Sequence, residues 1–520
     1  MTDDQTIFAP ATASGKAGVA VFRVSGNDAA QVIVRLCEPN ALPTPRRVVR
    51  RRIKNPQTGG TVDHALVLYF PAPHSFTGED VVELHTHGGR AVAAALIEGL
   101  RALPHFRLAE PGEFSRRAFE NGKMDLTEAE AIADLVAAET EAQRKQALRQ
   151  MEGALGALYE NWRERLTRAL AYMEAAIDFS DEEFPEDLIA QQSAALQALR
   201  DEIFAHLNDN HRGERLREGF SIAILGPPNA GKSSLLNALA RREAAIVSPI
   251  AGTTRDVIEV HLDIGGYPVT LADTAGLRAC EGVDVIENEG IRRARARAAA
   301  ADLKLVVLDG TVPDAAASMR EMIDADTIVV VNKADLIEEK DSNRESQKQR
   351  CGDSRDIPSP LRGGLGRGDA EGAGSENDRD VDLCSFSRMR FATSLPNPPL
   401  KGEGIPSLSR HHCFLPSRQA DALIHTCALT GSGIDALLEK LAQEIERRFA
   451  ATEAPPLTRA RHRAALEACA EHLTRALHAP MADKRAEDVR LAMRALGRIT
   501  GRVDVEDVLD MIFRDFCIGK

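Results

Sequence analysis

The chain has 520 residues, which exceeds one compact core and predicts roughly three domains of ordinary size. Its 65 basic and 78 acidic side chains give a formal net charge of −13, which argues against a protein that coats nucleic acid indiscriminately. Eight scattered cysteines lack the close paired spacing of a zinc site and are interpreted as reduced thiols. An acidic N-terminus and the lack of a long apolar stretch predict a cytoplasmic protein without a membrane span.

Three local basic clusters are candidate contacts for nucleic acid: residues 46–52, 212–217 and 292–297. A solvated helix or strand face is the commoner role of such clusters, and the sequence favours that role here.

Residues 1–121 have a mixed pattern that predicts an α+β domain. Residues 19–24 and 65–70 resemble strands, because short apolar and β-branched runs lie between turn residues. Residues 91–103 have apolar side chains at helical spacing. Sheet and helix therefore alternate in this first part of the chain.

Residues 122–217 are rich in alanine, leucine and glutamate, with apolar residues three and four apart, which predicts the first part of a helical domain. Thr127 and Glu130 fit a capping box near its start. Residues 218–450 have the pattern of an α/β nucleotide domain, and residues 451–520 are helical again. Because the apolar faces on both sides need a partner, the α/β domain is predicted to be inserted into one helical domain.

Residues 338–420 interrupt the α/β domain. They are poor in periodic apolar residues and rich in proline and glycine, which predicts a disordered insertion. The segment also contains four residues of types that can bind metal, Cys384, His411, His412 and Cys413. Their spacing is not that of a metal site, so an incidental cluster is the favoured interpretation.

Residues 226–233, GPPNAGKS, match the GxxxxGK[ST] phosphate loop and lie between an apolar strand and a helix. The N–H groups of such a loop and the dipole of the helix face the phosphates of a nucleotide. We expect Lys232 to reach the β- and γ-phosphate oxygens and Ser233 to offer its hydroxyl to Mg²⁺. The GTP-binding residues predicted in this segment are Asn229, Ala230, Gly231, Lys232, Ser233 and Ser234.

Two further strand ends carry residues typical of a GTPase. Asp273 begins the sequence DTAG and is expected to hold the magnesium shell. Asp335 ends the sequence NKAD and can accept two hydrogen bonds that guanine donates and adenine cannot. The predicted base is therefore guanine, and a P-loop kinase of small molecules is disfavoured. The GTP-binding residues predicted here are Asp273, Thr274, Ala275, Gly276, Asn332, Lys333, Ala334 and Asp335.

Two weaker elements complete the predicted nucleotide site. A switch segment around Thr253 and Thr254 is expected to supply a second hydroxyl to Mg²⁺. Cys427 follows a short apolar strand and begins a candidate guanine loop. The residues predicted from these elements are Ser248, Pro249, Ile250, Ala251, Gly252, Thr253, Thr254, Cys427, Ala428 and Leu429. Leu277 stands where many small GTPases carry a glutamine that orients water, so hydrolysis is very slow or another residue orients the water.

Several segments outside these motifs carry a further pattern. They are residues 4–7, 18–26, 76–84, 87–89, 111–114, 121–126 and the C-terminal FCIGK at 516–520. Together with the GTPase motifs, they resemble the MnmE family of tRNA-modifying GTPases, also called TrmE. The resemblance covers nearly the whole chain outside the insertion.

This resemblance implies a multidomain fold: an α+β N-terminal folate-binding and dimerisation domain, an all-α helical domain and an inserted Ras-like α/β P-loop G domain. It implies an enzyme that hydrolyses GTP and adds a carboxymethylaminomethyl or aminomethyl group at C5 of the wobble uridine of tRNA. The implied cofactors are Mg²⁺, K⁺ and a one-carbon tetrahydrofolate derivative, either 5-formyl- or 5,10-methylene-tetrahydrofolate. The implied partners are GTP, tRNA and the flavoprotein MnmG, in a heterotetramer that contains a homodimer.

Carried over by position, the resemblance also implies site residues. The folate contacts would be Arg23, Glu83, Lys123 and Lys520. Potassium would be held by Asn229, Ser248, Ile250 and Thr253, and Mg²⁺ by Ser233 and Thr254. The catalytic residues would be Lys232, Cys517 and Glu287, with Glu287 positioning the water. Glu289 is a weaker candidate for the same task, and a plain surface glutamate is the alternative. A small buried hydrophobe is an equally common role for a cysteine such as Cys517.

Two features depart from the family pattern. Cys427 and Ala428 stand where the family has a serine-alanine pair, and the insertion at residues 338–420 is not a feature of the family. A competing class is a ribosome-assembly or RNA-binding switch GTPase without covalent chemistry. Such proteins carry a KH-like or second G domain in place of the folate-type domain and the cysteine tail.

Overall fold

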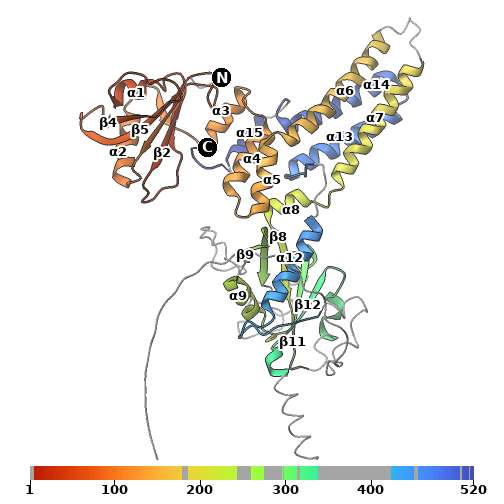
Figure 1. Cartoon of the computed structure of the whole chain (residues 1–520). Coiled ribbons are helices and arrows are strands. Elements are labelled where there is room, and N and C mark those ends of the chain that lie inside the picture. The colour runs from red at the N-terminus through yellow and green to blue at the C-terminus, as the bar shows by residue number, and fades with distance from the viewer. Residues whose placement is uncertain are drawn as a thin grey trace, which may run out of the picture.

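The computed structural model has two sheet domains joined to a long helical bundle (Figure 1). The N-terminal sheet domain lies at one side, and the bundle extends away from it. The second sheet domain, the G domain, lies below the base of the bundle. The structure describes residues 5–178, 186–242, 259–273, 296, 298–312, 317–337, 423–449, 455–503, 506–514 and 516–519. The insertion predicted at residues 338–420 lies outside the described residues.

The N-terminal domain combines a sheet with three helices. Its strands are β1 (Thr6–Pro10), β2 (Ala20–Ser25), β3 (Cys37–Glu38), β4 (Val49–Lys54), β5 (Thr61–Phe70), β6 (Val81–Thr86) and β7 (Phe106–Leu108), and its helices are α1 (Gln31–Leu36), α2 (Arg90–Arg101) and α3 (Glu113–Glu120). The strand order is β3-β4-β5-β6-β2-β1-β7, and only β1 and β7 pair in parallel. The strands and the helix predicted here correspond to β2, β5 and α2.

The two faces of this sheet differ, because side chains alternate between them along each strand. On β2, Phe22 and Val24 are buried in a core that also contains Leu96 and Leu100 of α2. Arg23 lies between them and therefore points to the opposite face. We call this opposite face, on which neither α1 nor α2 packs, the outer face of the sheet. Phe114 of α3 covers it beside β1, where it packs with Ile7 and Ala9.

The helical domain is built from both sides of the G domain. Its helices are α4 (Leu126–Ala137), α5 (Glu141–Met151), α6 (Ala154–Asp178), α7 (Glu186–Leu207), α8 (Arg212–Glu218), α13 (Ala460–His478), α14 (Ala482–Thr500) and α15 (Glu506–Arg514). Trp162 and Leu199 from the first part share one buried core with Leu466 and Val489 from the second part. The two amphipathic segments thus complete each other, as the sequence predicts.

The capping box predicted at Thr127 and Glu130 is wrong. The box consists of Asp125 and Glu128: the Glu128 N–H donates to Asp125 Oδ1 at 2.9 Å, and the Asp125 N–H donates to Glu128 Oε2 at 2.8 Å. Thr127 lies within the first turn, and its hydroxyl donates to Asp125 Oδ1 at 2.7 Å. Glu130 is only 2% exposed and is drawn into contacts with α13.

Glu130 is the centre of a buried ion cluster at the base of the bundle. Arg461 Nε donates to Glu130 Oε1 at 2.7 Å, and His462 Nε2 lies 3.0 Å from Glu130 Oε2. Burial alone would raise the pKa of Glu130, but His462, Arg461 and their hydrogen bonds hold it well below its usual range. Burial lowers the pKa of His462, which is fully enclosed, while the charge of Glu130 opposes that shift.

A second acid ties together the two points at which the chain enters and leaves the G domain. Asp134 Oδ1 accepts hydrogen bonds from Arg217 Nε at 3.1 Å and from Arg459 Nη2 at 2.7 Å. Arg217 lies in the last turn of α8, just before the G domain, and Arg459 lies just before α13. Arg217 belongs to the basic cluster at residues 212–217. Its ion pair with Asp134 is neither the solvated face nor the nucleic-acid contact considered for that cluster.

The G domain is an open sheet with helices. Its elements are β8 (Phe220–Leu225), α9 (Lys232–Arg242), β9 (Glu259–Ile264), β10 (Tyr267–Asp273), β11 (Leu303–Asp309), the 3₁₀ helix η1 (Ala317–Met322), β12 (Thr327–Asn332), β13 (Ile424–His425) and α12 (Ile434–Phe449). The strand order is β13-β12-β11-β8-β10-β9, and all neighbours are parallel except β10 and β9. Ligands bind such sheets at the carboxyl ends of the parallel strands.

The C-terminal segment returns to the N-terminal domain. Gly112 precedes α3 with a φ angle of 69°, and a side chain there would meet the Phe513 carbonyl oxygen at 2.7 Å. Pro111 and Ile518 form an isolated antiparallel bridge. The last residues are therefore held beside α3. No helix in the described part of the chain is long and apolar enough to cross a membrane.

Candidate functional site

The phosphate loop joins the end of β8 to the start of α9. Gly226 and Gly231 have φ angles of 151° and 92°. A side chain at Gly226 would meet the Val307 carbonyl oxygen at 2.2 Å, and one at Gly231 would meet Asn332 Nδ2 at 2.1 Å. Neighbouring strands thus press so closely on the loop that only glycine fits at both positions.

Lys232 begins α9 and is 8% exposed. Its Nζ donates to the carbonyl oxygens of Gly226 and Pro227, each at 2.9 Å, which holds the ammonium group against the loop. Asn229 has a φ angle of 63°, a left-handed conformation that asparagine tolerates well. Ser233 is exposed in the first turn of α9, as is Ser234, where helix N–H groups and the helix dipole favour an anion.

Asn332 connects the phosphate loop to the guanine loop. It ends β12 and is 2% exposed. Its Nδ2 donates to the Ala230 carbonyl oxygen at 3.0 Å, and its Oδ1 accepts from the Ala428 N–H at 3.1 Å. One side chain thereby fixes two loops that are distant in the sequence. The predicted residues Ala230, Asn332 and Ala428 are brought together by the fold.

Lys333 is held by an acid that the sequence analysis did not single out. Its Nζ donates to Asp309 Oδ2 at 2.7 Å, at the end of the neighbouring strand β11. Burial would raise the pKa of Asp309, but hydrogen bonds from Lys333 and Thr311 hold it below its usual range. Asp309 ends an apolar strand, and that position is the one signal that could have marked it.

Asp335 presents a buried oxygen to the same region. Its Oδ1 is covered and has no hydrogen-bond partner among the described residues. A buried carboxylate oxygen without a donor costs free energy, so the arrangement fits a ligand that supplies N–H groups. The N1–H and N2 amino groups of guanine are such donors.

The predicted guanine loop keeps its shape through backbone bonds. The Cys427 N–H donates to the Ser432 carbonyl oxygen at 2.9 Å, and the Gly431 N–H donates to the Cys427 carbonyl oxygen at 2.9 Å. The Cys427 side chain is buried, whereas Leu429 is 89% exposed. The replacement of serine by cysteine therefore changes a side chain that points inward and leaves these backbone bonds in place.

Part of the predicted site falls outside the described residues. Asp273 is the last residue of β10, and its backbone pairs with Ile224 next to the start of the phosphate loop. The predicted site residues outside the described part of the chain are Ser248, Pro249, Ile250, Ala251, Gly252, Thr253, Thr254, Thr274, Ala275, Gly276, Glu287, Glu289 and Lys520.

Two of the residues implied for folate binding meet on the outer face of the N-terminal sheet. Arg23 on β2 lies opposite Glu83 on β6, and its Nε and Nη2 each lie 3.2 Å from Glu83 Oε1. The guanidinium carbon lies 5.3 Å from the centre of the Phe76 ring and 5.8 Å from that of Phe114. His85 Nε2 lies 3.3 Å from Glu83 Oε2. The result is a charged pair between aromatic rings, which suits a flat polar ligand.

In the described part of the chain, neither Lys123 nor Cys517 is bonded to Arg23 or Glu83. Lys123 Nζ donates to the Pro73 carbonyl oxygen at 2.9 Å. Cys517 is exposed, so the alternative role as a small buried hydrophobe does not apply. Lys232 belongs to the G domain, so the structure does not bring it together with Cys517 (Figure 1).

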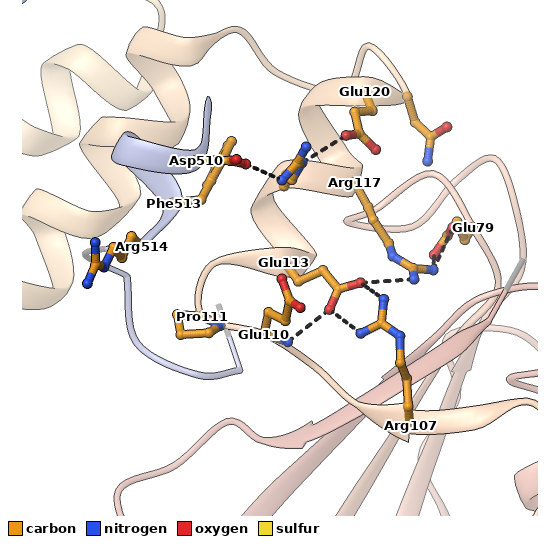
Figure 2. Close-up of a pocket in the computed structure, with 12 residues that line it drawn as sticks. Glu79, Arg107, Glu110, Pro111, Glu113, Arg117, Glu120, Asp510, Phe513 and Arg514 are labelled. Atoms are coloured by element: carbon orange, nitrogen blue, oxygen red, sulfur yellow. Dashed lines mark hydrogen bonds and ion pairs between the residues drawn. The ribbon is translucent and has the colours of Figure 1, made fainter. Parts of the chain in front are cut away.

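A cavity of about 460 Å³ lies between α3 and α15 (Figure 2). Arg107 clamps Glu113 with hydrogen bonds of 2.7 and 2.8 Å, and Arg117 joins Glu113 at 3.0 Å to Glu79 at 3.1 Å. Burial would raise the pKa of Glu113, but the hydrogen bonds from Arg107 lower it. These charges satisfy one another, so this network is structural. It was missed because Arg107 on β7 and Glu79 reach α3 only through the tertiary fold.

Two family models match the chain. One is described as the MnmE helical domain and matches residues 126–517, and the other is described as the GTP-binding protein TrmE N-terminus and matches residues 6–123. The chain belongs to the MnmE family. This membership confirms the resemblance and the fold class predicted from the sequence, and the chain is accordingly a GTPase, as predicted.

Full-length relatives agree with the family models. The tRNA modification GTPase MnmE of Parvibaculum lavamentivorans is 50% identical and covers 99% of this chain and 100% of its own length. The protein of the same name from Paramagnetospirillum magneticum is 50% identical, with coverage of 99% and 100%. That from Rhodospirillum rubrum is 48% identical, and all of both chains is covered.

Proposed function

We propose that this chain hydrolyses GTP in order to modify tRNA at C5 of the wobble uridine. Relatives that match it over their full length carry the name tRNA modification GTPase MnmE, at up to 50% identity. The observation that carries the nucleotide half of the proposal is Asp335, whose buried Oδ1 lacks a donor among the described residues. The product would be a uridine with a carboxymethylaminomethyl or aminomethyl group at C5.

Several groups of the chain would act on the nucleotide. Asp335 would read guanine, while Asn332 holds the phosphate loop and the guanine loop in register. Lys232 would contribute positive charge to the phosphates from its place against the loop. Glu287 would orient the attacking water, a task that Leu277 cannot perform.

Two cations would join this site. Ser233, with its exposed hydroxyl in the first turn of α9, and Thr254 would hold Mg²⁺. Asn229, which adopts a left-handed conformation within the phosphate loop, would hold K⁺ together with Ser248, Ile250 and Thr253. When bound, these cations would supply positive charge to the phosphate oxygens.

The one-carbon chemistry would take place at the N-terminal domain. Arg23 and Glu83 would orient a tetrahydrofolate derivative, and the Phe76 and Phe114 rings beside Arg23 fit the flat ring of such a ligand. Lys123 and Lys520 would hold its glutamate carboxylates. The bound derivative would supply the one-carbon unit. The exposed thiol of Cys517 is available as a catalytic group.

The reaction would also need partners. We propose that the chain acts in the cytoplasm as a homodimer that joins the flavoprotein MnmG in a heterotetramer. The domain limits at residues 121, 217 and 450 belong to the same proposal.

A deletion strain tests the proposal. Mass spectrometry of tRNA nucleosides should show loss of the C5-modified wobble uridine on deletion and its return with a plasmid copy. Unchanged wobble uridine together with accumulation of ribosomal RNA precursors would instead support a ribosome-assembly switch GTPase and refute the proposed function.

A further inference from the structure

One edge of the N-terminal sheet gathers basic side chains. We call this group the basic edge, and it consists of Arg46, Arg47, Arg50, Arg52, Lys54 and His64. Residues 46–54 read RRVVRRRIK, with six cations and no acid, in a chain whose net charge is −13. Because the whole molecule repels a polyanion, a local cluster of this kind is what could attract one.

The sheet register places Arg50, Arg52 and His64 of the basic edge on the outer face. Arg50 lies opposite Leu66 on β5, and Arg52 lies opposite His64. Ala65, between the two β5 residues, is buried in the core on the other face. Arg50, Arg52 and His64 are therefore exposed together on the outer face. They line a hollow of about 600 Å³ with Glu38, Pro39 and Arg51.

The charge of the basic edge is only partly neutralised. Arg52 and Lys54 share one carboxylate, that of Glu38, and Arg52 Nε donates to Glu38 Oε2 at 2.9 Å. Within the described residues, no hydrogen bond or ion pair holds the side chain of Arg47 or that of Arg50, and both residues are exposed. Two guanidinium groups thus remain available to bind phosphate bidentately.

The outer face continues from the basic edge to the charged pair Arg23–Glu83. Leu66 on β5 lies opposite His85 on β6, and Glu83 on the same strand lies opposite Arg23 on β2. The step from β4 to β2 crosses three strand spacings, or about 14 Å. An RNA strand anchored at the basic edge would have its neighbouring bases over β6 and β2.

We propose that the basic edge binds the phosphate backbone of tRNA and directs the RNA across the outer face towards Arg23 and Glu83. This inference rests on the proposed function, because it assigns a docking surface to the RNA substrate of that reaction. Contacts to phosphates fix the position of a nucleic acid without reading its sequence. The recognition of the wobble base would then belong to other groups.

A sheet edge also carries charges for another reason. β3 pairs only with Arg52 and Ile53, which leaves the rest of β4 as an edge, and charged side chains keep such edges from pairing with other chains. Arginine-to-glutamate substitutions keep the edge charged but reverse the sign of the charge. They therefore separate RNA binding from protection of the edge.

The test compares two full-length double variants with the same change in charge. Arg47→Glu with Arg50→Glu alters the basic edge, and Arg90→Glu with Arg101→Glu alters exposed residues of α2 on the covered side of the sheet. The probe is end-labelled total tRNA from the deletion strain, measured by filter binding at several salt concentrations. We expect the first variant to weaken binding about tenfold or more and to reduce the salt slope by about 2. The α2 variant should bind as the wild type does.

Three results would overturn the inference. Equal binding by both variants would remove the basic edge from RNA recognition. A change of oligomeric state in sedimentation, limited to the basic-edge variant, would assign the face to a second copy of the chain. If the wild-type gene restores wobble modification and the basic-edge variant restores it equally, only this inference fails. If the wild-type gene itself restores nothing, the proposed function fails first.

Discussion

Asp335 carries a buried carboxylate oxygen that no described residue satisfies, beside the loops that would hold a nucleotide. Replacing Asp335 by asparagine exchanges an acceptor for a donor. We expect GTP to bind roughly tenfold or more weakly, because the guanine N–H groups would lose their acceptor. Xanthosine triphosphate, which has a carbonyl at that position, should gain in relative affinity.

Competition binding with both nucleotides measures this change. Asp435→Asn is the matched control, since Asp435 is an exposed aspartate in the first turn of α12 in the same domain. A GTP-to-xanthosine-triphosphate preference unchanged in Asp335→Asn would remove Asp335 from base reading.

We expect the potassium dependence of GTP hydrolysis to require Asn229. Its left-handed place in the phosphate loop would let the side-chain oxygen hold a monovalent cation near the phosphates. An arginine finger in other GTPases accelerates hydrolysis by about 10³–10⁵. A cation of the right size would take over that charge here. We therefore expect faster GTP hydrolysis in KCl than in NaCl at equal ionic strength, by about tenfold or more.

The same assay with Asn229→Ala should lose the difference between the two salts. The Asn161→Ala variant, on the exposed side of α6, serves as its control. Equal rates for the wild type in both salts, or a potassium response kept by Asn229→Ala, would exclude this role.

Much of the nucleotide site could be predicted because its motifs are local. The phosphate loop and the NKAD segment each place their own residues beside one another along the chain. The bonds that fix these motifs are not local: Asn332 contacts Ala230 and Ala428, and Lys333 contacts Asp309 on another strand. Sequence spacing does not predict these contacts, because they form only when the strands pair in the folded sheet.

At the scale of elements, the caps illustrate the same limit. Asp125 with Glu128 and Thr127 with Glu130 both fit the spacing of a capping box. The structure uses the first pair, because Glu130 is buried against Arg461 and His462, which follow more than 300 residues later. The helices themselves were predictable from apolar periodicity, whereas the choice between the caps depended on tertiary contacts.

The same buried cluster predicts a pH dependence of stability. Folding lowers the pKa of both Glu130 and His462. A group with a lowered pKa stabilises the fold above its unfolded pKa and loses that contribution as the pH falls. His462 has the higher unfolded value, 6.5, so its contribution is lost first. We expect the free energy of unfolding to fall by about 1 kcal/mol per pH unit below pH 6 from His462.

Urea unfolding between pH 7.5 and pH 5 measures this slope. His462→Gln should be less stable at neutral pH. Its free energy of unfolding should depend less on pH, because the protonation of His462 no longer contributes to the slope. His478→Gln, at the exposed end of the same helix, should keep the full slope. A slope that is equal in all three proteins would contradict a lowered pKa of His462 in the fold.

For the whole molecule, the segment at residues 338–420 is expected to be dispensable. The chain leaves the described part after Ile337 and returns at β13, which pairs with the end of β12 through Val330 and Val331. The two sides of the segment therefore start from neighbouring strands. The free energy of closing a loop rises only with the logarithm of its length. A short linker should therefore join the two ends of this segment at little cost in stability.

We expect a Gly/Ser linker in place of residues 338–420 to leave GTP hydrolysis within about twofold of the wild-type rate. Turnover and thermal unfolding of the shortened protein check this. Loss of folded protein on replacement would show that the segment packs against the G domain.

We propose that GTP hydrolysis in the G domain drives modification of the wobble uridine. Nucleoside mass spectrometry of tRNA from a deletion strain that carries Lys232→Ala tests this coupling. Lys440→Ala, an exposed lysine on α12, is the control. We predict that the wild type and Lys440→Ala restore the C5-modified uridine and that Lys232→Ala does not, because the charge beside the phosphates is lost. Full restoration of the modified uridine by a Lys232→Ala protein that no longer hydrolyses GTP would show that the modification does not depend on GTP hydrolysis.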